Sequence, residues 1–184
     1  MLMNKDDSVL LVVDMQERLL PVIHEWQRLL DQVIWLVQVA QKVGVPVLPV
    51  ELYRLGLGET HAELRAALPA QDITEKIHFS CVAAGMFAPD QRGLPGAERR
   101  QVVVCGIEAH VCVLQTALEL REQGRAVFVV ADAVASRDPS NKQLALERLR
   151  GNGVDVVSCE MVAYEWLRQG GTPLFREINS RFLR

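Results

Sequence analysis

The sequence has few of the features that would place a protein in a specialised class. Aromatic residues make up only 5% of its 184 residues, and no apolar run approaches the ~20 residues that a membrane-spanning helix needs. The 20 basic and 23 acidic side chains leave a formal net charge of −3, so the composition offers no strongly basic surface. We therefore expect neither a nucleic-acid partner nor a membrane partner.

Cysteine is also scarce, and its spacing is not that of a disulfide framework or a zinc site. No pair of thiols has CxxC spacing and no Cys/His cluster occurs, so each thiol is either a core residue or a chemical group. Residues 1–8 are polar and lack the basic start and apolar stretch of a secretory signal, which favours a cytoplasmic location. The four thiols are Cys81, Cys105, Cys112 and Cys159.

Short apolar runs alternate with amphipathic stretches along the whole chain. Continuous runs rich in Val and Ile are typical of strands that are buried on both faces of a parallel sheet. The prolines Pro46 and Pro49 place the second run toward a sheet edge or at a strand end, and Asp132 is expected to close the fifth. Strands are predicted at residues 9–13, 45–50, 73–77, 101–105, 126–130 and 154–157.

Helical spacing separates these runs, because apolar residues recur every three or four positions between them. Residues 84–98 are rich in Gly and Pro and are expected to form loops. The repeated order of strand and helix predicts one domain over residues 1–184 with a three-layer α/β/α, Rossmann-like fold, whose doubly wound parallel sheet has about six strands. Helices are predicted at residues 22–37, 61–68, 109–123 and 139–149, with residues 161–183 helical in pieces.

Three polar groups follow predicted strands. Asp14 comes directly after the first strand, Lys76 lies at the end of the third, and the fourth leads into a helix that carries Cys112. In open α/β sheets, ligands bind outside the carboxyl ends of the strands, near the switch in strand order. We therefore expect Asp14, Lys76 and Cys112 to meet at one edge of the sheet.

The chemistry of these three side chains is coherent. A thiol attacks as the thiolate, and a helix N-terminus or a neighbouring lysine lowers its pKa. We accordingly expect the helix and Lys76 to lower the pKa of Cys112. A carboxylate such as Asp14 can take the thiol proton and later donate it to a leaving group. The set predicts acyl transfer from a C–N bond to water.

Each residue also has an ordinary structural explanation. An aspartate after a strand is often a loop or cap residue, and a single lysine usually keeps its charge at the surface. Cys112 taken alone could be a small buried hydrophobe, Cys105 is expected to be core, and packing is the favoured role for Cys81 and Cys159. Whether the three polar groups meet decides between chemistry and packing.

The same segments resemble those of the isochorismatase-like cysteine hydrolases, which include nicotinamidases and N-carbamoylsarcosine amidase. The resemblance covers essentially the whole chain and rests on LVVDMQ at residues 11–16, EKIHFS at residues 75–80 and GIEAHVCV at residues 106–113. VADAVASR at residues 130–137 agrees with a further family segment. Three segments in the right order make the resemblance specific, whereas any one of them alone would be weak.

The resemblance implies a role for each of these residues. Asp14 would be the general base and acid, Lys76 its electrostatic partner and Cys112 the nucleophile. The backbone N–H groups of Glu108 and Cys112 would form an oxyanion hole beside a cis peptide bond that precedes Glu108. A surface position stays the alternative for Gln16, and local packing for Phe79. The residues expected in a substrate pocket are Gln16, Tyr53, Phe79 and Ile107.

Departures from the family pattern narrow the predicted function. The loop after the second strand, residues 51–61, has no DxH motif and one histidine, His61. We therefore expect no catalytic metal and no cofactor. True isochorismatases lack the nucleophilic cysteine, so cleavage of isochorismate is not expected either. The sequence predicts a hydrolase that cleaves a small amide, carbamoyl or related C–N bond through a cysteine thioester, with the substrate unassigned.

Two other functions stay open. The chain could be a non-catalytic, oligomeric interaction protein, or a redox protein in which Cys112 forms a sulfenate. The redox function has no resolving cysteine at motif spacing. Members of the family commonly form dimers, tetramers or larger rings, so the resemblance implies a homo-oligomer. The tail around Trp166 would then be an oligomer contact, unless it covers the chain's own core.

Overall fold

The computed structural model describes residues 1–88 and 93–182, and within them the strands form one parallel sheet. The strand order is β3-β2-β1-β4-β5-β6, and every neighbouring pair is parallel. The order reverses between β1 and β4, as in a doubly wound sheet. The strands are β1 (Ser8–Val13), β2 (Val47–Leu52), β3 (Thr74–Lys76), β4 (Gln101–Ile107), β5 (Ala126–Ala135) and β6 (Asp155–Val157).

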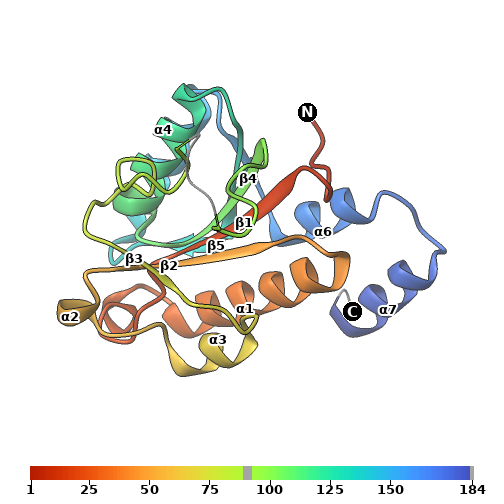
Figure 1. Ribbon diagram of the computed structural model, residues 1–184, viewed down its shortest axis with the longest axis horizontal. Helices are drawn as coiled ribbons and strands as arrows, with labels where there is room; N and C mark the ends of the chain where they lie inside the picture. The colour runs from red at the N-terminus through yellow and green to blue at the C-terminus, as the bar shows by residue number, and fades with distance from the viewer. Residues whose placement is uncertain (89–92, 183–184) are drawn as a thin grey trace.

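Helices cover both faces of this sheet (Figure 1), which confirms the predicted α/β/α layers. The helical segments are η1 (Leu20–Val22), α1 (Trp26–Val43), α2 (Arg54–Leu57), α3 (Ala62–Ala67), η2 (Ala109–Val113), α4 (Leu114–Glu122), α5 (Pro139–Gly151), α6 (Cys159–Leu167) and α7 (Pro173–Phe182). One face carries α1, α3, α6 and α7, and the opposite face carries η2, α4 and α5. Among the described residues, no helix is both long and apolar enough to cross a membrane.

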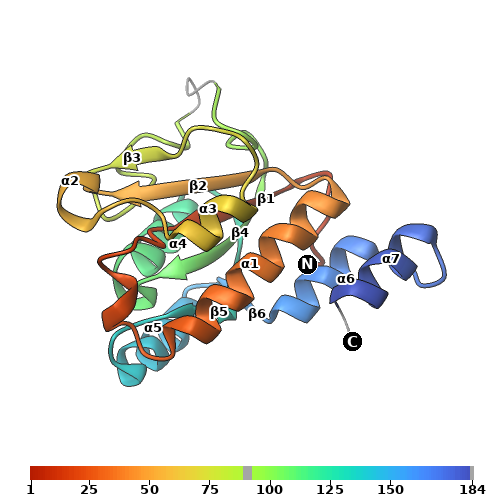
Figure 2. The same cartoon turned by 90° about the horizontal axis from the view of Figure 1, so that it is seen from below.

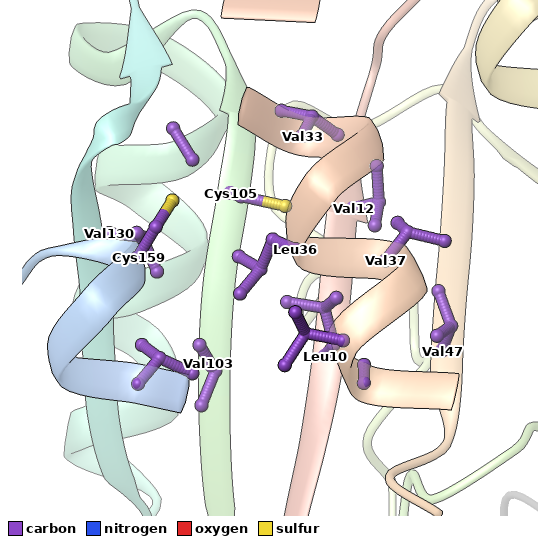
Figure 3. Close-up of a cluster of buried hydrophobic side chains, with 14 of the residues drawn as sticks. Leu10, Val12, Val33, Leu36, Val37, Val47, Val103, Cys105, Val130 and Cys159 are labelled. Carbon is purple, nitrogen blue, oxygen red and sulfur yellow. The ribbon is translucent and has the colours of Figure 1, made fainter. Parts of the chain in front are cut away.

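The two central strands are buried along their whole length, as expected for the middle of a parallel sheet. Alternate residues of β1 and β4 face opposite helical layers, because side chains alternate along a strand. Figure 3 shows the layer under α1, where helix side chains pack on both strands. Cys105 and Cys159 lie in this layer, as predicted for core thiols. Labelled members include Leu10, Val12, Val33, Leu36, Val37 and Val103.

Strand β5 extends beyond the predicted end at Asp132. It runs to Ala135 because its pairing with β4 shifts register, so that Val134 lies opposite Gly106. Such an irregularity inserts extra residues while the strand continues. Asp132 is exposed, and its Oδ1 accepts a hydrogen bond of 2.9 Å from the backbone N–H of Cys159. Asp132 therefore holds the start of α6 instead of ending the strand.

The prediction of one continuous helix over residues 109–123 was wrong at its start. Residues 109–113 form a π-helical turn, η2, before α4 begins at Leu114. The expected edge position of β2 also needs correction, because β2 has a neighbour on each side. Strand β3 pairs with β2 only from Val50 onward, so the proline at residue 49 lies where that side of β2 is unpaired.

The C-terminal tail covers the chain's own core. Trp166 of α6 is 1% exposed, and Ile178 of α7 is fully buried in the layer that contains α1. The predicted loop at residues 84–98 has turns and bends in its described part, and residues 89–92 lie outside the described residues. Helical structure was predicted as far as residue 183; α7 is described as far as Phe182, and residue 183 lies outside the described residues.

Candidate active site

The site begins where β1 and β4 end side by side, at the reversal of strand order. Gly106 has φ +112°, and a Cβ placed there would lie 2.1 Å from the carbonyl oxygen of Val13. Only glycine permits this approach of the two backbones. The contact holds Asp14, directly after β1, beside residues 107–108, directly after β4. A polar group at the end of one central strand thus lies next to the backbone turn of the other.

Lys76 reaches Asp14 from the end of β3. Its Nζ donates a hydrogen bond of 2.8 Å to Asp14 Oδ2, and both side chains are 0% exposed. Leu52 of β2 pairs with Lys76, so the lysine side chain crosses above β2 to reach the end of β1. Burial removes the hydration of both charges, and their attraction and hydrogen bond offset that cost. The surface position considered for a lone lysine does not apply to Lys76.

The second oxygen of the Asp14 carboxylate is not paired with Lys76. Asp14 Oδ1 is buried and accepts no hydrogen bond of ordinary geometry from the described residues. Burial raises the pKa of Asp14, while the Lys76 ammonium and the nearby Cys112 thiol oppose that rise. The carboxyl group consequently holds a proton more firmly than an ordinary aspartate, which suits a group that takes and returns protons.

Cys112 lies in η2, on the side of the sheet that carries α4, and is 3% exposed. Burial and the Asp14 carboxylate raise the pKa of its thiol, and the smaller effect of Lys76 opposes them. The prediction of a lowered pKa was therefore wrong for the free protein, because the depth of the thiol outweighs its cationic neighbour. The raised pKa favours the protonated form of the Cys112 thiol, which lies close to the Asp14 carboxylate.

Glu108 follows β4, and the Ile107–Glu108 peptide bond is cis, as the resemblance implied. Its carboxylate accepts hydrogen bonds from the Arg137 backbone N–H, Nε and Nη2 at 3.0, 3.1 and 2.8 Å. Burial alone would raise the pKa of Glu108, but the bonds and charge of Arg137 outweigh it and lower the pKa. This pairing ties the segment before Cys112 to the end of β5.

The residues expected in a pocket have different surroundings. Gln16 is fully buried, and its Nε2 donates to the carbonyls of Leu52 and Gly58 while its Oε1 accepts from the Leu52 N–H. Gln16 therefore ties two loops together, and the surface alternative was wrong. Ile107 is also fully buried, whereas Tyr53 and Phe79 are 49% and 52% exposed.

Two further residues, outside the set predicted to be catalytic or to line the pocket, lie near the site. Cys81 is buried, and burial raises the pKa of its thiol to about 12, with smaller effects from Lys76 and Asp14. His110 Nδ1 lies 2.9 Å from the Ser136 hydroxyl, which links η2 to the end of β5. The sequence indicates only weakly that Cys81 lies near the site, because Cys81 follows Lys76 by five residues in a turn-rich segment.

The loop after β2, whose lack of a DxH motif led to the expectation of no metal, contains one histidine. The His61 ring packs against Trp26, with 5.7 Å between ring centres. Within residues 1–88 and 93–182, no three His, Cys, Asp or Glu side chains are grouped as metal ligands. The expectation of metal-free chemistry stays a prediction.

Comparison with known proteins agrees with this fold. Residues 8–161 match the family described as the isochorismatase domain. Isochorismatase domain-containing protein 2 of Danio rerio is 36% identical over 93% of this chain and 84% of its own length. The secreted isochorismatase effector Isc1 of Phytophthora sojae is 34% identical over 94% of this chain and 82% of its own length. The chain belongs to the isochorismatase family, and it is a hydrolase of that family.

Solved structures share the whole fold. The MAR1 ribonuclease of Caenorhabditis elegans superposes with a TM-score of 0.89 at 28% identity, over 100% of this chain and 93% of that chain. The YcaC gene product of Escherichia coli, described as an octameric hydrolase of unknown specificity, superposes with a TM-score of 0.83. It is 24% identical over 91% of this chain and 83% of that chain, so it supports the fold alone.

Proposed function

We propose that this chain is a cysteine hydrolase that cleaves a small amide, carbamoyl or related C–N bond through a thioester on Cys112. One observation carries the proposal. The buried Asp14 carboxylate uses one oxygen on Lys76 and keeps the other, Oδ1, unpaired near the Cys112 thiol. A base that is held by a third group beside a nucleophile is the arrangement that activates a thiol.

The first half of the reaction forms the thioester. The thiol proton passes to Asp14 Oδ1 as the sulfur attacks the carbonyl carbon, and the carbonyl oxygen becomes an oxyanion. The backbone N–H groups of Glu108 and Cys112 would donate to that oxyanion. The C–N bond then breaks, Asp14 returns the proton to the leaving nitrogen, and the acyl group stays on the sulfur of Cys112.

The second half restores the enzyme. A water molecule gives a proton to Asp14 and attacks the thioester carbon, and the C–S bond breaks as the acid product forms. Asp14 returns the proton to the sulfur. The Lys76 ammonium holds the carboxylate in place in both halves, and its charge favours the ionised forms of its neighbours. These steps use no metal and no cofactor.

Four residues complete the proposed site around a small substrate. Tyr53 and Phe79 are half exposed and would form the apolar rim that contacts the substrate. Ile107 would form the floor of the site. Gln16 would act indirectly, because the hydrogen bonds of its side-chain amide fix the turns that carry Asp14 and Tyr53.

The experiment that tests this function is a screen of small amides and carbamoyl compounds, with release of ammonia or amine as the readout. We expect Cys112→Ala to abolish release, while Cys159→Ala, which removes another buried thiol, retains it. In the native protein, rapid quench and intact mass should detect an acyl group on Cys112. Turnover that survives Cys112→Ala would rule out the thioester mechanism. If folded wild-type protein turns over nothing in the screen, the non-catalytic interaction function takes precedence.

Assembly and location belong to the same proposal. The protein would act as a homo-oligomer. This is supported by the octameric E. coli neighbour and by large apolar side chains with exposed fractions of 49% or more, Tyr53, Leu55, Ile77 and Phe79. Light scattering should give a mass that is a multiple of the single chain. A cytoplasmic location stays a prediction, because the Phytophthora relative is named a secreted effector. A small molecule remains the proposed partner, with neither nucleic acid nor membrane.

A further inference from the structure

A second cavity lies at the carboxyl end of β5, between the first turns of α1 and α5. It encloses about 300 Å³ and its wall contains none of Asp14, Lys76 and Cys112. Figure 2 shows the start of α1 and α5 close together beside β5. At roughly 30 Å³ for each atom, as for a water molecule in the liquid, the volume holds about ten non-hydrogen atoms.

The extension of β5 builds this cavity. Strand β6 pairs with β5 only as far as Val130, so residues 131–135 continue past it and form part of the wall. Two helices start at the same place, and a helix N-terminus carries a partial positive charge. The N-cap residue of α1, Glu25, has no side-chain cap bond to that helix. The start of α5 is capped by the Asp138 carboxylate, which accepts a hydrogen bond of 2.8 Å from the Ser140 N–H. The uncapped start of α1 is therefore the backbone feature that favours a negative group.

Lys142 is the charged side chain of the cavity wall whose charged group has no ion pair or hydrogen bond with a described residue. Arg28 Nη1 lies 3.7 Å from Glu25 Oε2, and Asp132 Oδ1 accepts a hydrogen bond from Cys159. The backbone N–H of Lys142 in α5 donates to the carbonyl oxygen of Asp138 at 3.4 Å. Its side chain is half-buried, and the ammonium forms no ion pair or hydrogen bond with any described residue. Burial lowers the pKa of Lys142, and the Asp132 and Glu25 carboxylates, which are too far away to form an ion pair with it, oppose that effect only in part. A negative group in the cavity would supply a close partner.

The rest of the wall is apolar. Leu29 of α1 and Val134 of β5 are both buried residues that contribute to it. Two alanines of β5, Ala131 and Ala135, complete this part of the wall. An inorganic ion would leave this part of the wall without a contact. A short hydrocarbon group attached to the charge would cover it, at about 25 cal/mol for each Å² of apolar surface removed from water.

We propose that this cavity binds a small organic carboxylate, with its charge on the Lys142 ammonium and its hydrocarbon part against Leu29 and Val134. The site is additional to the proposed hydrolytic site and does not depend on it. Its carboxylate oxygens would lie at the amino end of α1, where the charge of that helix adds to that of Lys142.

Butyrate is a suitable probe, and its binding to the full chain can be followed by titration calorimetry. We expect Lys142→Gln to weaken butyrate binding about tenfold, which corresponds to about 1.4 kcal/mol. Arg148→Gln is the matched control, because it removes an exposed positive charge from the same helix outside the cavity. It should leave binding unchanged. Glu25→Gln, at an exposed rim position, should strengthen binding because it removes a negative charge.

Three results would overturn the proposal. One is equal butyrate affinity in wild type and Lys142→Gln, and another is an equal loss in Arg148→Gln. The third is inorganic phosphate binding as tightly as butyrate, which would mean that the apolar wall contributes nothing. Cys112→Ala should retain butyrate binding; loss in that variant, with none in Lys142→Gln, would assign the ligand to the hydrolytic site instead.

Discussion

At the scale of single residues, the candidate site brings together a carboxylate, an ammonium group and a thiol, all of them buried. The side chains of Asp14 and Lys76 are fully buried together, and Cys112 is 3% exposed. In the proposed mechanism, a substrate would meet the thiol before the carboxylate. The raised pKa values of Asp14 and Cys112 favour a mechanism in which proton transfer accompanies attack on the substrate.

The alkylation of Cys112 should depend on pH in a way that reports these neighbours. In the wild type, reaction with iodoacetamide should rise at a pH above the ~8.5 of an ordinary cysteine. Asp14→Asn removes the carboxylate that raises the thiol pKa, so the profile should move to lower pH. Lys76→Met removes the opposing positive charge and should move it to higher pH. Peptide mapping at a series of pH values measures all three profiles.

Circular dichroism of each variant provides the control, since breaking a buried ion pair can cost about 3–5 kcal/mol of stability. The two variants should shift the profile in opposite directions. Identical shifts in folded Asp14→Asn and Lys76→Met would mean that altered packing, and not charge, sets the reactivity of Cys112.

The pair of Glu108 and Arg137 should contribute stability that depends on pH. The pKa of Glu108 is lowered from its usual 4.5, so the folded state binds its proton more weakly than the unfolded state. Its stabilisation is then fully present above about pH 4.5 and is lost as the pH falls through the folded-state pKa. We expect Glu108→Gln to lower the free energy of unfolding by about 1–3 kcal/mol at neutral pH, as measured with urea.

In strong acid the wild type and Glu108→Gln should become equally stable, because the carboxyl group is then protonated. A gap between the two that stays constant from neutral to acid pH would assign the loss to packing of the amide instead of charge. Arg137→Gln should reproduce the same pH dependence, since it removes the other partner from the pair.

At the scale of elements, the strands were largely predictable from local sequence. Unbroken Val and Leu runs gave β1 and β4 to within a residue or two, because a strand buried on both faces must be apolar throughout. The extension of β5 was not predictable, because Asp132 interrupts the apolar run. The π-helical start of η2 has no compositional signal. Both features come from tertiary pairing around Gly106 and Val134, which local periodicity does not contain.

The sequence predicted which residues of the candidate site lie near one another, but not the direction of the pKa shift at Cys112. Strand ends placed Asp14, Lys76 and Cys112 near one another, because the carboxyl ends of parallel strands meet at one edge. The direction of the Cys112 pKa was missed, since burial depth is a property of the packed layers. The bonds of Gln16 to the turns after β2 were missed for the same reason.

The contact between β1 and β4 at Gly106 should be the most sensitive backbone position in the site. Gly106→Ala places a methyl group 2.1 Å from the Val13 carbonyl oxygen, so the strands must separate. We expect a loss of about 3 kcal/mol or more in the free energy of unfolding, measured with urea. Gly124→Ala is the matched control, because φ is also positive there and nothing lies within 4 Å of the added Cβ. Its cost should be about 1 kcal/mol. Equal losses of unfolding free energy in the two variants would show that the positive φ, and not the contact with Val13, sets the cost.

At the scale of the whole molecule, the two cores on either side of the sheet enclose every cysteine. Cys105 and Cys159 lie in the layer with α1, and Cys81 and Cys112 lie in the layer with α4. Apart from Cys112 at the strand ends, a thiol in either layer meets a reagent only when the structure around it opens, so its reactivity reports the cooperativity of the fold. The sheet joins the two layers through β1 and β4, which have side chains in both.

The native protein should therefore react with at most one thiol when treated with Ellman's reagent, and that thiol should be Cys112. Its 3% exposure is small, but it lies at the strand ends, whereas Cys81 and Cys105 are fully enclosed. The other three thiols should react at rates that follow global unfolding as urea is raised, because exposing any of them separates a helical layer from the sheet. Cys112→Ala should remove the native reaction and leave the urea-dependent one. Early reaction of Cys159 would instead mean that α6 opens as a local unit while the sheet stays folded.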